Sequence, residues 1–153
     1  MENAVKALYI AAGVLMGVMI LSLAVVLHSG LQGYVETSNK ETRFNELTRF
    51  NAKYTKYIDV DLTIQDIVTV ASEAYENNNS YNPETSAWND VGPNSLYVAI
   101  YLEGYGRIDT QIKEKMVELL ETNTGKTYQC SNDNVKYSDD TGRIYSMNFS
   151  EKP

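Results

Sequence analysis

The first third of the chain contains one long apolar stretch. Residues 7–27 (ALYIAAGVLMGVMILSLAVVL) include no charged residue, no proline and no amide. At about 1.5 Å of rise per residue, a helix of this length covers roughly 30 Å, the thickness of the hydrocarbon in a bilayer. A helix in the core of a globular domain seldom needs apolar side chains around its whole circumference. The pattern therefore favours a membrane-spanning helix over a buried core helix.

The same stretch is longer than the hydrophobic region of a signal peptide. A small-x-small cleavage site should follow such a region, whereas the segment after it reads HSGL at residues 28–31. We therefore expect the stretch to be retained. Lys6 precedes it and no Lys or Arg follows before Lys40. The positive-inside tendency then places the N-terminus in the cytoplasm and the rest of the chain outside the membrane, as a single-pass protein.

A polar helix with one apolar stripe follows the apolar stretch of residues 7–27. Apolar side chains recur every three or four residues, at Phe44, Leu47, Phe50, Tyr54, Tyr57 and Ile58. This spacing is typical of an amphipathic helix. We expect one long helix over residues 3–57, either straight or kinked where Gly30 and Gly33 lower the helix propensity. The alternative is a new helix that begins at Ser38, which could form a capping box with Glu41.

The remaining pattern predicts two helices and a sheet. Thr63 and Asp66 have the spacing of an N-terminal cap, and the helix after them has an apolar stripe at Ile64, Ile67, Val68, Ala71, Ala74 and Tyr75. Two of the three prolines lie in residues 78–94, which we interpret as a surface loop. Trp88 in this loop is expected to cover the core, with an exposed contact residue as the alternative.

The chain from residue 95 on is predicted to contain short strands and one helix. In residues 95–104 (SLYVAIYLEG), Leu96, Val98, Ile100 and Leu102 alternate with Tyr97, Ala99 and Tyr101, as in a half-buried strand. Asp109 or Thr110 is expected to cap a helix with inward Ile112, Met116, Leu119 and Leu120, which Asn123 and Gly125 end. Short strands at KTYQC, VKY and RIYSMNF close the chain, the last after a turn at residues 139–142.

These elements predict an α+β protein in three parts. Residues 1–30 form a hydrophobic transmembrane or assembly helix, and residues 31–58 continue it as an amphipathic helix. Residues 59–153 form a small acidic domain of two helices and a 3–4-stranded antiparallel sheet. Helices first and an antiparallel meander last are typical of the α+β class.

Charge excludes one class of partner. The chain has 13 Lys+Arg and 20 Asp+Glu, and its first 27 residues contain only Lys6 and Glu2, so 12 and 19 remain after them. A surface this acidic does not suit nucleic acid, whose phosphates require a basic face. The single Cys130 cannot form a disulfide within the chain.

No constellation for catalysis, cofactor binding or metal binding is predicted, and we expect no enzyme. The only histidine, His28, has no ligand-type neighbour at metal spacing and is expected to anchor the membrane boundary. The acids at Asp139–Asp140 and the segment Asn132–Asn134 lack the spacing of a calcium loop. Gly104-Tyr105-Gly106 lacks the third glycine of a dinucleotide fingerprint and is expected to form a turn leading into the next helix.

Five residues are candidates for helix packing and assembly. Gly13 and Gly17 form a GxxxG pair, which lets two helix backbones approach closely. Ser22 also has a small side chain that lets another helix approach closely. Glu2 and Lys6 are spaced i,i+4 in the favourable order and can neutralise each other at the edge of the membrane.

The arrangement of an apolar N-terminal helix, an amphipathic continuation and a compact domain with an antiparallel sheet resembles type IV pilins and pseudopilins. In that family the mature helix carries a Glu at its fifth position, whereas the acid before the stretch here is Glu2. The segments FNAKYTKY and LTIQDIVTVASEAYENN also resemble small membrane-anchored surface proteins of gut Firmicutes.

The first resemblance implies a structural subunit of an extracellular filament. Its partners would be copies of itself through the N-terminal helix, the membrane before assembly, and proteins of an assembly machinery. It implies a position at the cell surface or in the filament. The alternative is a single-pass, membrane-anchored binding or accessory protein of a secretion or conjugation apparatus. Neither reading requires a cofactor.

Overall fold

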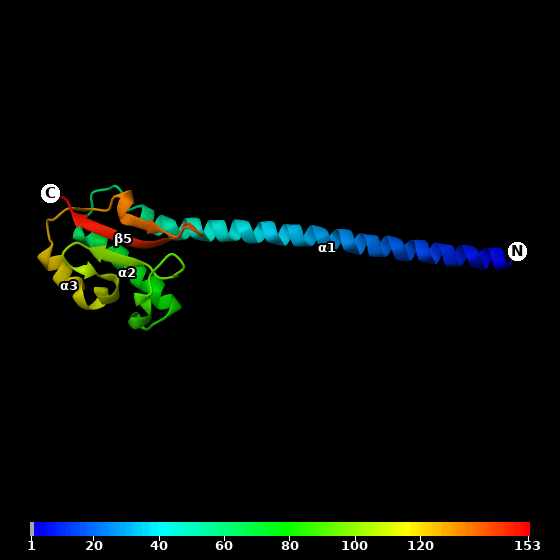
Figure 1. The fold of residues 1–153 in the computed structure, drawn as a ribbon, viewed down its shortest axis with the longest axis horizontal. Helices are drawn as coiled ribbons and strands as arrows, with labels where there is room; N and C mark the ends of the chain where they lie inside the picture. Colours follow the sequence, from blue (N-terminus) through cyan, green and yellow to red (C-terminus); the bar gives the residue numbers. More distant parts are fainter. Residues whose placement is uncertain (1) are drawn as a thin grey trace. The chain divides into compact units, whose positions relative to one another are not determined.

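The computed structural model describes residues 2–153, and the chain divides into two compact units, Met1–Asn45 and Glu46–Pro153. One helix, α1 (Glu2–Thr55), supplies all of the described part of the first unit and the beginning of the second. It is continuous through Gly30 and Ser38 (Figure 1). The prediction of one long helix is therefore confirmed, and no new helix begins at Ser38.

The second unit has two further α-helices and five short strands, together with three 3-10 helices. In chain order they are α2 (Ile64–Tyr81), η1 (Thr85–Asn89), β1 (Ala99–Leu102), β2 (Gly106–Arg107), η2 (Asp109–Gln111), α3 (Ile112–Thr122), β3 (Tyr128–Gln129), η3 (Asn132–Asn134), β4 (Val135–Tyr137) and β5 (Ile144–Glu151). The predicted α+β class is confirmed.

The sheet is mixed, and β5 is its central strand. Its order is β2-β1-β5-β3, and β4 also pairs with β5. β5 runs antiparallel to β3 and β4 but parallel to β1, with Ala99 opposite Ser146 and Leu102 opposite Phe149. The sequence predicted antiparallel pairing only. The parallel pair arises because α3 and the segments after it form a long crossover, which returns the chain in its original direction.

The cap and the buried stripe of α2 follow the prediction. The Thr63 hydroxyl accepts a hydrogen bond from the Asp66 backbone N–H, and the Asp66 carboxylate accepts one from the Thr63 N–H, which makes a capping box. The predicted stripe is buried except for the partly buried Tyr75. Trp88 is fully buried and meets Tyr75 edge to face, with ring centroids 5.1 Å apart, so its predicted role in covering the core is confirmed.

The alternation of buried and exposed side chains expected over residues 96–102 holds only in part. Leu96 is half exposed, whereas Ala99, predicted on the outer side, is completely buried. The strand begins at Ala99, so Leu96 lies outside the sheet. Val98, Ala99 and Ile100 are buried in succession. Both faces of this segment are therefore covered, and a pattern of period two cannot appear.

The last turns of α1 belong to the core of the second unit. The Asn51 side chain donates to the Gly142 carbonyl (2.8 Å) and accepts from the Ile144 N–H (3.0 Å). Tyr54 is fully buried. After α1 ends, the chain turns at Asp59, which has a φ of 57°, a left-handed conformation that Asp tolerates better than most residues. The compact unit therefore begins at Glu46 rather than after the helix.

This packing predicts that the small domain needs the end of α1. A fragment of residues 59–153 should unfold at a lower urea concentration than a fragment of residues 38–153, because it lacks Tyr54 and the two hydrogen bonds of Asn51. Fluorescence of Trp88, the only tryptophan, reports the unfolding of both. Equal midpoints would show that the end of α1 does not stabilise the domain.

Candidate functional site

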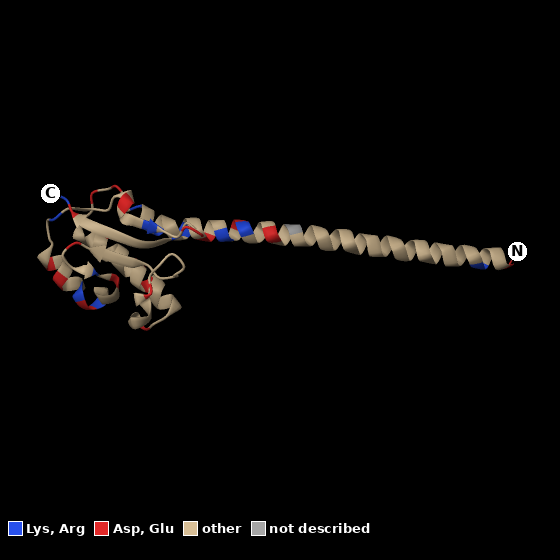
Figure 2. Ribbon diagram, in the orientation of Figure 1, with Lys and Arg blue, Asp and Glu red and all other residues tan. Residues whose placement is uncertain are grey.

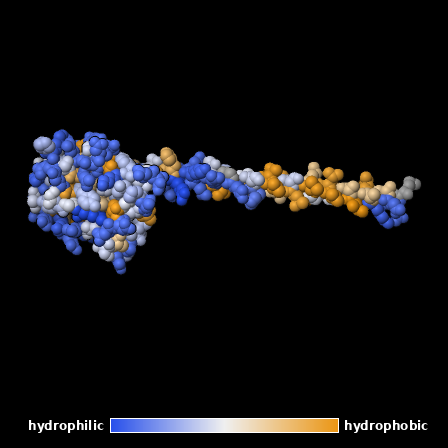
Figure 3. Space-filling model, viewed as in Figure 1, coloured by the Kyte–Doolittle hydropathy of each residue, from blue (hydrophilic) through white to orange (hydrophobic). Residues whose placement is uncertain are grey.

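The apolar surface of α1 is the largest chemical feature of the first unit. Every large apolar side chain from Leu8 to Leu27 is more than half exposed. Figure 3 shows the resulting hydrophobic length of helix, and Figure 2 shows no charged residue on it between Lys6 and Glu36. Because a helix satisfies its own backbone hydrogen bonds, such a surface suits a lipid or other apolar environment. By length and composition, α1 can span a membrane.

Four of the five candidate packing residues share one side of α1. Glu2, Lys6, Gly13 and Gly17 are spaced by four, seven and four residues, and at about 100° per residue these steps return to the same face. No atom lies within 4 Å of a methyl group placed on either glycine, so this side of the helix is open. Ser22 comes five residues after Gly17 and lies on a different side.

The polar candidates on α1 are satisfied within the helix. The Lys6 ammonium lies 2.9 Å from a carboxylate oxygen of Glu2, as the i,i+4 spacing predicts. The Ser22 hydroxyl donates to the Val18 carbonyl at 2.8 Å. Both arrangements lower the cost of placing these groups near apolar surroundings.

His28 is paired along the helix. Its Nε2 lies 2.9 Å from the side-chain nitrogen of Gln32, one turn further on. Within residues 2–153, no group of three or more His, Cys, Asp or Glu side chains is placed to hold a metal ion.

The second unit contains a buried ionic network that the sequence did not predict. Asp109 is completely buried, and its carboxylate accepts hydrogen bonds from the Ile100 N–H (3.0 Å), the Asn78 amide (3.3 Å), and Nε and Nη2 of Arg107 (both 2.9 Å). Arg107 also donates to the Trp88 carbonyl at 2.7 Å. The two-point contact between guanidinium and carboxylate is the strongest geometry for such a pair.

This network corrects two predictions. Asp109 was expected to cap a helix, but it begins the 3-10 helix η2 and makes no capping bond, because its carboxylate turns into the core. Asn78 was expected in a loop, but α2 continues to Tyr81. The Asn78 side chain is buried and exchanges hydrogen bonds with the Val98 backbone, at 2.8 and 2.9 Å. The available signal was the pair of opposite charges two residues apart, Arg107 and Asp109.

The charged groups of the network are directed inward. The Asp109 carboxylate and the Arg107 guanidinium are directed at each other and at backbone groups of several elements. Since both charges are compensated inside the fold, the network joins α2, η1 and the β1–β2 region into one body.

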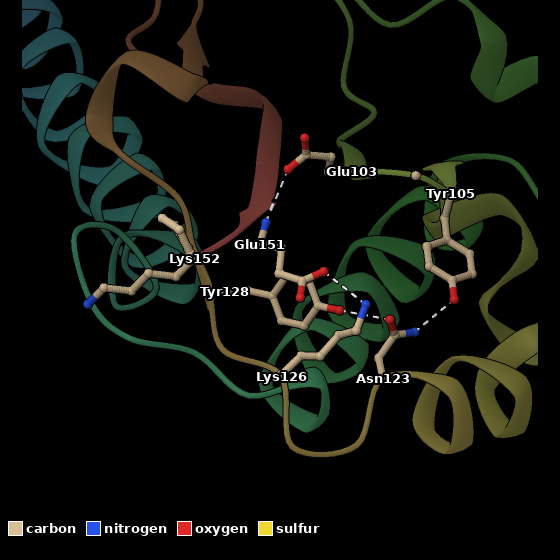
Figure 4. Close-up of a pocket in the computed structure, with 9 residues that line it drawn as sticks. Glu103, Tyr105, Asn123, Lys126, Tyr128, Glu151 and Lys152 are labelled. Atoms are coloured by element: carbon tan, nitrogen blue, oxygen red, sulfur yellow. Dashed lines mark hydrogen bonds and ion pairs between the residues drawn. The ribbon is translucent and has the colours of Figure 1, made fainter.

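A shallow hollow of about 510 Å³ lies beside β5 and the end of α3 (Figure 4). The Asn123 side chain at its base accepts from the Tyr128 hydroxyl (2.8 Å) and donates to the Tyr105 hydroxyl (3.0 Å). At its rim, Lys126 and Glu151 form an ion pair at 2.9 Å. These side chains mainly satisfy one another, so the hollow presents no pair of nucleophile and base.

The remaining sequence candidates lie in turns or in the core. Gly104 and Gly106 have φ angles of 82° and 74° and flank the turn between β1 and β2. They form a hairpin turn rather than the predicted entry to a helix. Asp139, Asp140 and Gly142 form the predicted turn before β5. Cys130 is buried, and burial raises the pKa of its thiol to about 11.

The Asp109 network generates a stability prediction. Replacing Asp109 by Ala leaves the largely buried Arg107 guanidinium without its carboxylate, which should lower the free energy of unfolding by about 3 kcal/mol. Urea unfolding of the full chain, followed by Trp88 fluorescence, measures the loss. Asp133→Ala removes an exposed acid and serves as the control. If both variants unfold at the same urea concentration, the network does not hold the domain together.

Comparison of the chain with models of protein families, with curated proteins and with solved structures finds no match. The candidate site is therefore defined by chemistry alone. It is the open apolar side of α1 with Glu2, Lys6, Gly13 and Gly17, carried on a helix whose end is built into a compact domain.

Proposed function

We propose that this chain is a pilin-like structural subunit of an extracellular filament. Residues 7–27 of α1 would pack with the same helix of other copies in the filament core, and the acidic domain would face the solvent. One observation carries the proposal: the helix that exposes the apolar side chains of residues 7–27 continues without a break to Tyr54, which is buried in the core of a compact domain. Such a helix can hold a domain at a fixed place in an assembly.

The side of α1 that carries Gly13 and Gly17 supports contact with another helix. In lipid, apolar side chains alone do not drive helices together, so close contact depends on small residues that let backbones approach. Both glycines are open, and the Glu2–Lys6 pair lies on the same side. The pair would bring no net charge into the buried end of the assembly.

The charge of the chain supports an outward-facing domain. After residue 27 there are 12 Lys+Arg against 19 Asp+Glu, since only Lys6 and Glu2 are removed from 13 and 20. An acidic, well-hydrated surface favours exposure to solvent and disfavours nucleic acid. In this proposal the helix lies in the membrane before assembly, with the N-terminus in the cytoplasm, and proteins of an assembly machinery transfer the subunit to the filament.

A second candidate function is a single-pass, membrane-anchored binding or accessory protein of a secretion or conjugation apparatus. The observation that favours it is the distribution of large apolar side chains around every side of the stretch. Lipid alone can cover such a helix, without copies of the chain. The two candidates differ in whether the glycine pair must meet another helix.

Replacing Gly17 by Leu tests the contact between helices. Lipid solvates Leu at least as well as Gly, and helix propensity rises by up to about 1 kcal/mol, so insertion should be unharmed. We expect normal amounts of Gly17→Leu protein in the membrane but few or no filaments, because the isobutyl group blocks the approach of a second backbone. Electron microscopy of surface material counts the filaments, and membrane immunoblots measure the protein.

Leu15→Val is the matched control, since it changes an apolar side chain elsewhere on the same turn without adding bulk. It should assemble like the parent. If Gly17→Leu also forms filaments in normal numbers, the glycine pair is incidental, and the membrane-anchored accessory protein becomes the better assignment.

A cysteine in the domain tests the orientation in the membrane. Ser86 is exposed, so Ser86→Cys should react with a bulky, impermeant thiol reagent on intact cells. The parent is a clean control, because Cys130 is buried and a pKa of about 11 leaves it almost entirely protonated at pH 8. Labelling of Ser86→Cys only after lysis would place the domain in the cytoplasm.

A further inference from the structure

Three polar atoms are buried in the second unit without a hydrogen-bond partner from the described chain. They are the Tyr54 hydroxyl oxygen, Oε2 of Glu73 and Nε of Arg143. Tyr54 as a whole is completely buried. Buried polar atoms in native proteins are nearly always bonded to protein or to ordered water, because an unpaired one retains its full cost of desolvation. Three such atoms in one small domain require an explanation.

Contacts with neighbouring side chains bring these three residues to one region. Glu73 on α2 forms an ion pair with Lys56, the residue after the end of α1: its Oε1 lies 3.1 Å from the Lys56 ammonium. The Arg143 guanidinium lies over the Phe50 ring, 3.8 Å from its centroid. The rings of Phe50 and Tyr54 are in contact, with centroids 5.2 Å apart. Both charged groups lie close enough to Tyr54 for their charges to act on its hydroxyl.

One other nitrogen of Arg143 already has hydrogen-bond partners. Its Nη2 donates to the Leu96 carbonyl (2.7 Å) and to the Asn77 side chain (3.4 Å). Asn77 lies one turn after Glu73 on the same side of α2.

Burial raises the pKa of Tyr54, the Glu73 charge raises it further, and the Arg143 charge opposes this. Both charges therefore act on the same neutral hydroxyl.

We propose that one buried water molecule bridges the Tyr54 hydroxyl, Glu73 Oε2 and Arg143 Nε. The water accepts hydrogen bonds from the Tyr54 O–H and the Arg143 Nε–H and donates one to the Glu73 carboxylate. Three bonds are typical of a buried water. The site joins α1, α2 and the turn before β5, so the water would help to fix the end of the long helix in the domain.

The charges of the site favour water over an ion. The Arg143 guanidinium repels a cation, and the Glu73 carboxylate repels an anion. One positive and one negative group compensate each other, so the occupant needs no charge. It must accept a hydrogen bond from the Arg143 Nε–H and donate one to the Glu73 carboxylate, and a water molecule can do both at once.

The effect of Tyr54→Phe has a different sign with and without the water. If the water is present, removing the hydroxyl breaks a buried bridge, and the ratio of folded to unfolded protein should fall about tenfold. Without it, the change removes an unpaired buried hydroxyl, and the ratio should stay the same or rise. Urea unfolding of the full chain in detergent, with Trp88 fluorescence, decides between the two.

Two tyrosines calibrate this experiment. Tyr81→Phe removes a hydroxyl from a half-exposed side chain and should leave the ratio unchanged. Tyr128→Phe removes a direct bond of 2.8 Å to Asn123 and should lower the ratio. A Tyr54→Phe protein as stable as the parent, or more stable, overturns the proposal.

A direct bond between Tyr54 and Glu73 would also make Tyr54→Phe destabilising, so a second measurement uses the unaltered chain. A crystal structure that resolves ordered water should place one oxygen within about 3.2 Å of all three atoms. The Tyr54 hydroxyl bonded directly to Glu73, a site occupied by sodium or chloride, or no density between the three atoms would each contradict the proposal.

Discussion

The apolar surface of residues 7–27 must be removed from water, and the rest of the molecule depends on how this happens. Fourteen large apolar side chains between Leu8 and Leu27 are more than half exposed. At about 1.5–3 kcal/mol for each side chain, their burial is worth roughly 20–40 kcal/mol. This exceeds the stability of a typical domain, about 5–15 kcal/mol. An apolar environment, such as lipid, would therefore stabilise this stretch strongly relative to water.

The compact domain is built to hold the other end of that helix. Asn51 joins α1 to the turn before β5, and the buried Tyr54 makes the helix part of the core. In the same domain, the Asp109 network joins α2 to the β1–β2 region. The polar groups of both regions are turned inward, toward other parts of the fold. These contacts make the end of α1 part of the core of the domain.

Local patterns predicted most of the helices, because each signal lies within a few residues. The Thr63–Asp66 capping box, the apolar stripe of α2 and the stop at Asn123 are examples. The parallel pairing of β1 with β5 was not predicted, since it joins segments almost fifty residues apart in a short sheet. Two-residue strands such as β2 and β3 also carry too few positions to show a period.

The polar core was the part that sequence reasoning missed. Asp109 has the residue type and position of a helix cap, and Asn78 lies in an asparagine-rich run typical of a loop. Their burial depends on Arg107 and the Val98 backbone, which only the tertiary fold brings to them. The packing candidates on α1 were different. Their shared side follows from helix periodicity alone, whereas Ser22 lies on another side.

Electron cryomicroscopy of detergent-free material sheared from cells tests the central claim most directly. The proposal predicts filaments composed of this chain, with helices of residues 7–27 bundled at the centre, the side of Gly13 and Gly17 against a neighbouring helix, and the acidic domains outside. Recovery of the chain only from the membrane fraction, as single molecules without filaments, would contradict it.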